Sequence, residues 1–321
     1  MKATASAHPI QGLIKYHGLK DERLRIPFHD SISVCVDALS TTTTVEADES
    51  LADDLIIING RVIVGRDRER VEKVIDALRR KVGNSGYFKI VSQNSLVGGK
   101  GLGFSSSGFA ALGLAVSSCL DLDIDYISLS EIVRLGAGSA TRSLAGSFAL
   151  WHANKNGRSY AKQILDPESS DLVMIIVPIS SNVKTDDAHS EVLSSPFFKA
   201  RLKGIEKMVE SMKKAILDND IPSIGELAEE DTLNLHAVTI TGKSRMLLWK
   251  PDTVRIIEQV YEMRRDEIPA WYSIDTGPSV FINTMKEHSQ DVISRLLELK
   301  LDNIVLSGIG DKPLLSSKHL F

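Results

Sequence analysis

A run of glycine and serine at residues 94–112, NSLVGGKGLGFSSSGFAAL, contains the residue types best suited to binding an anion. Its four closely spaced glycines let the backbone bend around a phosphate group. Hydroxyl groups follow at the expected start of an apolar helix, where side chains and N–H groups can bind phosphate: Ser105, Ser106 and Ser107. The run therefore predicts a phosphate site, although Phe104 stands where a nucleotide-binding loop needs a small residue.

Two further segments carry a cation among small or apolar residues. Lys15 lies in LIKYHGLKD on an expected strand, where a lysine either points to solvent or serves a buried anion site. Arg142 lies in GAGSATRSLAGSF at the expected start of a helix, and its small neighbours let a ligand approach closely. A guanidinium there can hold a carboxylate or phosphate through two parallel hydrogen bonds, or it can be an ordinary arginine of a surface helix.

One carboxylate completes the candidate set. Asp275 ends an apolar strand in SIDTGPSVF, next to a Thr-Gly-Pro turn. Capping the turn is the commonest role of an aspartate in such a position. The alternative is a buried acid facing an anionic ligand, where like charge would raise its pKa and cations would lower it.

The elements that must position these residues follow from hydrophobic periodicity. In the first third, β-branched residues alternate in SISVCVDAL, TTTTVEAD and DLIIINGRVIVG, and Asn59-Gly60 is a strong hairpin turn, which predicts an antiparallel meander. A helix over 67–82, a strand in FKIVSQNS and a helix over 105–120 follow. SLSEIVRLG predicts another helix, with Ser128 or Ser130 as its N-cap.

The second half begins after residues 166–170, whose Asp, Pro and Ser content is typical of a connecting segment. Its expected elements are a strand over 171–179, helices over 197–217, 222–234, 251–264 and 288–299, and strands in WYSIDTGPSVFIN and NIVLSGIG. The sequence thus predicts an α+β protein, with one domain over 1–168 that contains the glycine-serine run and a second over 169–321 that carries Asp275.

Composition argues against several classes of function. The 321 residues have a formal net charge of −4, and no basic tract is long enough to follow a nucleic-acid backbone. No segment approaches the ~20 apolar residues of a membrane span, and the N-terminus lacks the apolar core of a signal peptide. Cys35 and Cys119 lie far apart in apolar runs, which indicates buried, reduced thiols in a cytoplasmic protein. No His, Cys and Asp have metal-ligand spacing, so no metal site is expected.

Together, these segments resemble the diphosphomevalonate decarboxylases, a branch of the GHMP kinase superfamily, nearly from end to end. The matching motifs are Lys15-Tyr16-His17-Gly18-Leu19, Pro27 with Ser31-Ile32-Ser33-Val34, Gly138-Ser139-Ala140-Thr141-Arg142-Ser143, Glu230-Asp231 with His236-Ala237, and Asp275-Thr276-Gly277-Pro278. The resemblance implies a two-domain GHMP-kinase-like fold, with an N-terminal α/β domain of the ribosomal-protein type and a ferredoxin-like C-terminal α/β domain. It also implies a homodimer that acts on a phosphorylated mevalonate.

The resemblance assigns roles to individual residues. Asp275 would act at C3 of the substrate, as a base or as a carboxylate that stabilises developing positive charge. Lys15 would neutralise phosphate and carboxylate, and Arg142 would hold an anionic end of the substrate together with Ser139. Further substrate-binding candidates are Tyr16, His17, Ser105, Ser106, Lys100, Lys184 and Thr185. His17 replaces the family's tryptophan and is either a polar neighbour of the substrate or a packing residue, whereas His236 is expected to pack between helices.

The departures from the family concentrate on nucleotide binding. The first of the family's two phosphate-binding serines becomes Phe104, whose ring removes a hydroxyl group and crowds a triphosphate, and an alanine becomes Lys100. The family's Ser-Ser-Thr turn becomes Val183-Lys184-Thr185, which adds a cation that can hold a phosphate already attached to the substrate. Its second lysine becomes Leu19, which indicates one phosphate fewer at C5.

The sequence is therefore interpreted as a decarboxylase of the mevalonate pathway, similar to the archaeal enzymes that act on mevalonate 3,5-bisphosphate. Such an enzyme eliminates CO2 and the 3-phosphate without ATP, gives isopentenyl phosphate and needs no cofactor. One alternative is a diphosphomevalonate or phosphomevalonate decarboxylase that uses ATP and Mg²⁺. A small-molecule kinase that does not decarboxylate is a second, and a non-catalytic anion-binding protein is a third.

Overall fold

Strands of the first half, with one strand from the C-terminal end of the chain, form two sheets in a computed structural model that describes residues 1–83, 86–96, 102–180, 185–301 and 303–321. The larger sheet has the order β16-β1-β6-β9-β7-β8, with β1 (Lys2–Ala7), β6 (Thr41–Ala47), β7 (Leu55–Ile58), β8 (Arg61–Val62), β9 (Phe88–Asn94) and β16 (Leu314–Ser316). The smaller has the order β11-β10-β5-β2, with β2 (Ile10–Ile14), β5 (Ser31–Cys35), β10 (Phe148–Lys155) and β11 (Arg158–Leu165). A short ribbon pairs β3 (Leu19–Asp21) with β4 (Ile26–Pro27).

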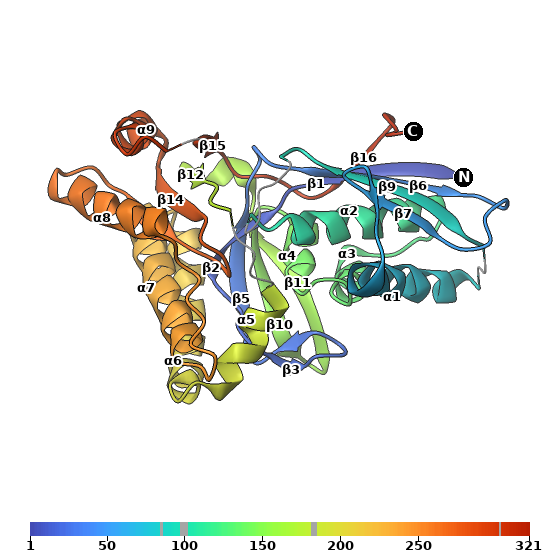
Figure 1. The fold of residues 1–321 in the computed structure, drawn as a ribbon, viewed down its shortest axis with the longest axis horizontal. Helices are drawn as coiled ribbons and strands as arrows, with labels where there is room; N and C mark the ends of the chain where they lie inside the picture. Colours follow the sequence, from blue (N-terminus) through green and yellow to red (C-terminus); the bar gives the residue numbers. More distant parts are fainter. Residues whose placement is uncertain (84–85, 97–101, 181–184, 302) are drawn as a thin grey trace.

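The second half contributes the sheet β13-β14-β12-β15 and most of the long helices. Its strands are β12 (Leu172–Val177), β13 (Trp271–Ser273), β14 (Val280–Met285) and β15 (Val305–Ser307). Its helices are α5 (Thr185–Glu191), α6 (Phe198–Leu217), α7 (Ile221–Ile240), α8 (Pro251–Arg265) and α9 (Ser289–Leu297), with short 3-10 turns at Pro167–Ser169, Val192–Ser194 and Lys286–His288. Figure 1 shows α6 and α7 side by side, with α8 and α9 at the far end of the molecule from the chain termini.

The helices of the first half pack in a layer between the larger and the smaller sheet. They are α1 (Gly65–Val82), α2 (Phe104–Cys119), α3 (Tyr126–Val133) and α4 (Ala140–Ala145). The apolar helix α2 lies against β1 and β6, and α1 and α3 pack beside it (Figure 1). The helix α1 carries its apolar residues on one face, as the sequence pattern predicts. This layer fixes the position of the start of α2, where the glycine-serine run ends.

The predicted antiparallel meander is wrong. The expected strands β5 and β6 follow each other in the chain but belong to different sheets, and β7 pairs in parallel with β9. Because α1 crosses over between β8 and β9, the chain can return to place β9 parallel to β7. The hairpin turn at Asn59-Gly60 is confirmed, since Ile58 pairs with Arg61 and both turn residues have positive φ.

Two other expectations need correction. The hairpin β10–β11 was not predicted, because the first six residues of β10 are all buried and show no alternation of apolar and polar residues. The N-cap of α3 is Asp125 rather than Ser128 or Ser130, and its carboxylate accepts from the Ser128 N–H at 2.8 Å. Cys35 and Cys119 are free thiols in the interior, and burial raises the pKa of Cys35 to about 12.

One apolar core joins the two halves of the chain. It contains Val34 and Leu13 of the smaller sheet, residues of α6 and α7, and Trp271 and Phe281 of the second half. This shared core holds the strand that precedes Asp275 against the strand that precedes Lys15. The α+β class is confirmed, whereas the boundary at 168/169 stays a prediction. None of the described helices is long and apolar enough to span a membrane.

Candidate active site

Asp275 lies in the turn between β13 and β14, with its carboxylate against the backbone of β2. The Gly12 N–H donates to both carboxylate oxygens, at 3.2 Å each. A Cβ atom on Gly12 would stand 2.7 Å from Asp275 Oδ1 and 2.7 Å from Lys15 Cγ, so glycine is required for this close contact. Burial raises the pKa of the Asp275 carboxyl, while Lys15 and Arg142 oppose that rise. Asp275 is thus a partly buried acid among cations.

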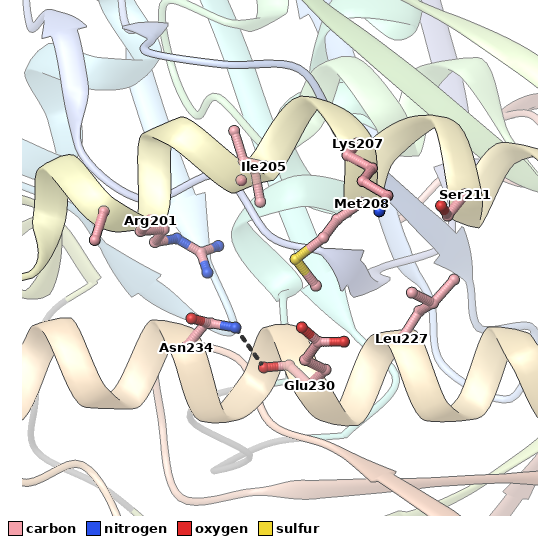
Figure 2. A pocket seen from close by; sticks show the side chains of 10 residues that line it. Arg201, Ile205, Lys207, Met208, Ser211, Leu227, Glu230 and Asn234 are labelled. Atoms are coloured by element: carbon pink, nitrogen blue, oxygen red, sulfur yellow. Dashed lines mark hydrogen bonds between the residues drawn. The ribbon is translucent and has the colours of Figure 1, made fainter.

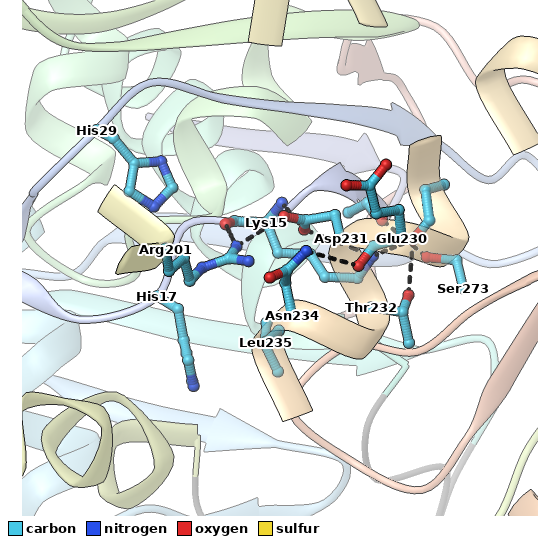
Figure 3. A network of polar contacts seen from close by, with 12 residues as sticks. Lys15, His17, His29, Arg201, Glu230, Asp231, Thr232, Asn234, Leu235 and Ser273 are labelled. Atoms are coloured by element: carbon cyan, nitrogen blue, oxygen red, sulfur yellow. Dashed lines mark hydrogen bonds and ion pairs between the residues drawn. The ribbon is translucent and has the colours of Figure 1, made fainter. Parts of the chain in front are cut away.

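The main chain of Lys15 is held by two side chains of the second half. The Lys15 N–H donates to Asp231 Oδ2 at 2.7 Å, and the Lys15 carbonyl accepts from Arg201 Nη2 at 2.9 Å. The same Arg201 nitrogen lies 2.8 Å from Asp231 Oδ1. Figure 3 shows Arg201 and Asp231 on either side of Lys15 in this network. The position of Lys15 is therefore fixed through its backbone, which leaves the ammonium group available.

The Lys15 side chain is buried rather than solvent-facing, with 4% of its surface exposed. Its Nζ donates to the Ala228 carbonyl at 3.3 Å and lies 3.9 Å from Asp231 Oδ2. Burial lowers the pKa of Lys15, whereas Asp231 and Asp275 raise it. Since an ammonium group has three N–H donors, Nζ can donate further hydrogen bonds to an anion beside Asp275.

Arg142 is an interior residue of α4 and is only 2% exposed, so it is not an ordinary surface arginine. Its guanidinium lies against two aromatic rings, 5.3 Å from the centroid of Tyr16 and 5.7 Å from that of Trp151. Within the described structure its Nε and Nη1 have no hydrogen-bond partner. Burial lowers the pKa of Arg142 to about 10, which leaves the group charged at neutral pH. A buried cation with two unused donors is suited to hold an anionic ligand.

Tyr16 and His17 follow Lys15 after the end of β2 and belong to an aromatic cluster. The Tyr16 ring stacks on His189 with centroids 4.6 Å apart, and meets Trp151 edge-on at 4.9 Å. His17 is fully buried, with Nε2 2.9 Å from Thr239 Oγ1 and Nδ1 3.2 Å from His189 Nδ1. Burial and the neighbouring His189 keep the pKa of His17 well below its usual value, so the ring is neutral. These contacts support the packing interpretation of His17.

The serines at the start of α2 are only partly available to a ligand. The Ser106 hydroxyl donates to the Gly103 carbonyl at 2.6 Å and accepts from the Ile10 N–H at 3.3 Å. Ser107 Oγ lies 2.7 Å from Thr41 Oγ1. Ser105 is exposed, and Phe104 packs partly buried against the core shared by the two halves. The predicted role of Ser106 in substrate binding therefore competes with two bonds to the protein.

The remaining predicted residues have different outcomes. Ser139 is the half-buried N-cap of α4, one turn before Arg142. Lys100 and Lys184 lie outside the described residues, as does the side chain of Thr185. His236 is buried in α7 and is a packing residue as expected, but its ring lies against Trp249 of the segment before α8, with centroids 5.0 Å apart, rather than between two helices. In the part of the chain that the structure describes, no three His, Cys, Asp or Glu side chains are grouped to hold a metal ion.

Sequence reasoning did not find two groups of charged residues. No sequence motif points to Arg201, and Asp231 occurs only as part of a family motif. The second group is an arginine cluster, Arg25, Arg66 and Arg70, around Asp186. Its one sequence signal is the spacing of Arg66 and Arg70, which puts both on the same face of α1.

A cavity of about 340 Å³ lies between α6 and α7 (Figure 2). Arg201 lines it together with apolar residues such as Met208 and Leu227. Because neither Asp275 nor Arg142 contributes to its wall, this cavity is separate from the group of catalytic candidates. The candidate active site is instead the group formed by Lys15, Arg142 and Asp275, whose charges act on one another beside Gly12 of β2.

Comparison with known proteins identifies this arrangement. Residues 7–161 match the family model of the diphosphomevalonate decarboxylase-like N-terminal domain, and residues 176–305 match that of the mevalonate 5-diphosphate decarboxylase C-terminal domain. The chain belongs to the diphosphomevalonate decarboxylase family. Members of this family are carbon–carbon lyases of the mevalonate pathway with the GHMP-kinase-like fold, so the expected fold and enzyme class are confirmed.

Similar proteins cover almost the whole chain. A phosphomevalonate decarboxylase of Haloferax volcanii is 38% identical over 97% of this chain and 96% of that protein. A diphosphomevalonate decarboxylase of Candida albicans is 32% identical over 88% of this chain and 84% of its own length. The crystal structure of mevalonate diphosphate decarboxylase from Staphylococcus aureus matches with a TM-score of 0.91 and 32% identity, over 98% of each chain.

Proposed function

We propose that this decarboxylase acts on mevalonate 3,5-bisphosphate and needs no ATP. The C1–C2 bond and the C3–O bond to phosphate break, and the electron pair of the C1–C2 bond becomes the C2–C3 double bond. CO2 and inorganic phosphate leave, and isopentenyl phosphate remains. The 38% identity to a phosphomevalonate decarboxylase supports a substrate with one phosphate at C5.

The three converging side chains suit the charges that this reaction develops. As phosphate departs, C3 becomes electron-poor, and the Asp275 carboxylate stabilises that positive charge. Lys15, which like Asp275 lies against Gly12, neutralises the departing phosphate. Arg142 uses its free Nε and Nη1 to hold an anionic group of the substrate in a fixed orientation. With the leaving group already attached, Asp275 has no hydroxyl proton to remove.

The main support for independence of ATP is the arrangement of side chains at the start of α2. There Phe104 occupies the first helical position and packs against the core, while the Ser106 hydroxyl is bonded to Gly103 and Ile10. These residues do not fit a triphosphate, which needs small side chains and free donors at a helix N-terminus. We therefore propose that the enzyme works without ATP and Mg²⁺.

The test is to incubate the protein with mevalonate 3,5-bisphosphate, with and without ATP and Mg²⁺, and to measure CO2 and phosphate. We expect equal release of both products in both conditions. The Asp275→Asn variant serves as the matched control and should release neither. Absence of turnover unless ATP is present would refute the proposal.

The main alternative is an ATP-dependent phosphomevalonate or diphosphomevalonate decarboxylase. One solved relative of 28% identity, MDDEF, is in complex with MVAPP, AMPPCP and magnesium. Turnover of mevalonate 5-phosphate with ADP formation by the present chain would support this alternative. Formation of a homodimer and a cytoplasmic location stay predictions, which gel filtration and cell fractionation can test.

A further inference from the structure

The arginine cluster lies beside the candidate active site and has its own counter-ion. Asp186, in the first turn of α5, forms two ion pairs: its Oδ1 is 2.6 Å from Arg25 Nη2, and its Oδ2 is 2.8 Å from Arg66 Nη2. Arg70 lies one turn after Arg66, and its Nε donates to the Gly136 carbonyl at 2.8 Å. Asp186 therefore pairs with two guanidiniums of the cluster, while Arg70 Nη1 lies 3.8 Å from Asp67 Oδ1.

The cluster is enclosed more than a surface ion pair usually is. The side chains of Arg25 and Asp186 are 11% and 16% exposed, and Arg25 Nε is buried with no hydrogen-bond partner in the described structure. Burial alone would raise the pKa of Asp186, but Arg25, Arg70 and Arg66 outweigh burial and hold it below its usual value. The carboxylate is thus ionised at neutral pH and bound to the arginines.

Tyr16 connects this cluster to the catalytic candidates. Arg142 lies over the face of the Tyr16 ring at 5.3 Å, and Arg25 and Arg70 are also near enough for their charges to act on the Tyr16 hydroxyl. Cationic groups therefore flank Tyr16 from α4 and from the arginine cluster. A substrate that carries an anion at each end can bind Arg142 through its reacting end. Its second anion then lies near the arginine cluster.

Charge counting then limits what this second anion can be. Three guanidiniums give +3, while Asp186 and the exposed Asp67, which lies 3.8 Å from Arg70 Nη1, give −2, so the cluster presents +1. A phosphate monoester carries about −1.5 to −2 at neutral pH, which already balances that charge. A terminal diphosphate carries more negative charge and is larger, so part of it would meet the Asp186 carboxylate.

We propose that Asp186 is a specificity-determining residue, an internal counter-ion that adapts the arginine cluster to one phosphate and excludes a diphosphate. The inference rests on the proposed function, since it takes the C5 end of the substrate as the group that binds here. Like charge between Asp186 and the outer phosphate disfavours the diphosphate, which is discrimination by repulsion.

The test compares two substrates that differ only at C5, mevalonate 3,5-bisphosphate and its 5-diphosphate counterpart. In Asp186→Asn, kcat/KM for the diphosphate relative to the monophosphate should rise at least about tenfold, the equivalent of about 1.4 kcal/mol. Asp187→Asn changes the adjacent, exposed carboxylate by the same substitution and should leave the ratio unchanged. An unchanged ratio in Asp186→Asn would overturn the inference.

A second variant and a binding probe make the outcome independent of folding and of turnover. Arg66 is 61% exposed, and Arg66→Gln removes one positive charge from the cluster, so the ratio should shift further toward the monophosphate. Binding of inorganic pyrophosphate and of inorganic phosphate can be measured without catalysis, as the rise in melting temperature that each causes. If neither substrate reacts without ATP but Asp186→Asn strengthens pyrophosphate binding, the proposed function fails while the role of Asp186 stands. If the bisphosphate reacts and pyrophosphate binding does not change, the role of Asp186 fails alone.

Discussion

Replacing Arg142 should separate activity from stability, because this side chain is buried without hydrogen-bond partners for its Nε and Nη1 in the described structure. If both nitrogens bind the substrate, Arg142→Met removes two charge-assisted hydrogen bonds of about 1.5–3 kcal/mol each. The sum corresponds to a loss of about 10²–10⁴-fold in kcat/KM. Arg142→Lys keeps the charge but loses one of the two bonds, so we expect a loss of about 10–150-fold.

The same replacement should change the free energy of unfolding little. Methionine gives up the contacts with Tyr16 and Trp151, each worth up to about 2 kcal/mol in a desolvated site. It also removes an unpaired buried charge, whose desolvation costs several kcal/mol. Because these contributions have opposite sign, we expect Arg142→Met to lie within about 2 kcal/mol of the wild-type protein.

Both quantities can be measured on the same preparations. Release of CO2 and phosphate gives kcat/KM, and urea unfolding followed by circular dichroism gives the free energy of unfolding. A stability loss in Arg142→Met comparable to that of removing a paired buried charge, about 3–5 kcal/mol, would show that Arg142 is structural. Full activity in Arg142→Met would equally refute the assigned role.

Four further results are expected. Asp231→Asn leaves Arg201 and Lys15 without their shared counter-ion and should lower the free energy of unfolding in urea by about 3–5 kcal/mol. Gly12→Ala forces a methyl group to within 2.7 Å of Asp275 Oδ1, so kcat should fall with little change in KM. Asp275→Asn should abolish CO2 release while the substrate still raises the melting temperature. Burial lowers the pKa of Lys15, so the alkaline limb of the pH profile of kcat/KM should lie below the usual lysine range. Because a bound phosphate raises that pKa again, the alkaline limb of kcat should lie at higher pH than that of kcat/KM.

Local features of the fold could be predicted well from the sequence, but pairings between distant segments could not. The helix α1 and the turn at Asn59-Gly60 depend on nearby residues, and both were found. The assignment of β5 and β6 to different sheets, and the parallel pairing of β7 with β9 after α1, depend on contacts between distant segments, which periodicity does not encode. The strand β10 escaped prediction because it is buried on both faces.

The candidate site shows the same division. Lys15, Arg142 and Asp275 were found because unusual residue types occur in recognisable motifs, although their proximity comes only from the packing of β2 against the second half. Arg201 sits in an ordinary amphipathic helix with no motif of its own. Its role depends on one hydrogen bond to the Lys15 carbonyl across 186 positions of sequence, which a single sequence cannot reveal.

The change at Phe104 has a structural consequence beyond the loss of a hydroxyl group. Its ring packs against the apolar core that joins the two halves of the chain, so a position suited to phosphate binding here contributes to packing. That same core supports β2, whose Gly12 contacts Asp275. Restoring a serine at this position would therefore weaken packing near the site as well as add a donor, so Phe104→Ser alone is not expected to create an efficient ATP-dependent enzyme. Under the proposed function, a substrate that carries its own 3-phosphate removes the need for that donor, and Lys15 and Arg142 supply the cations.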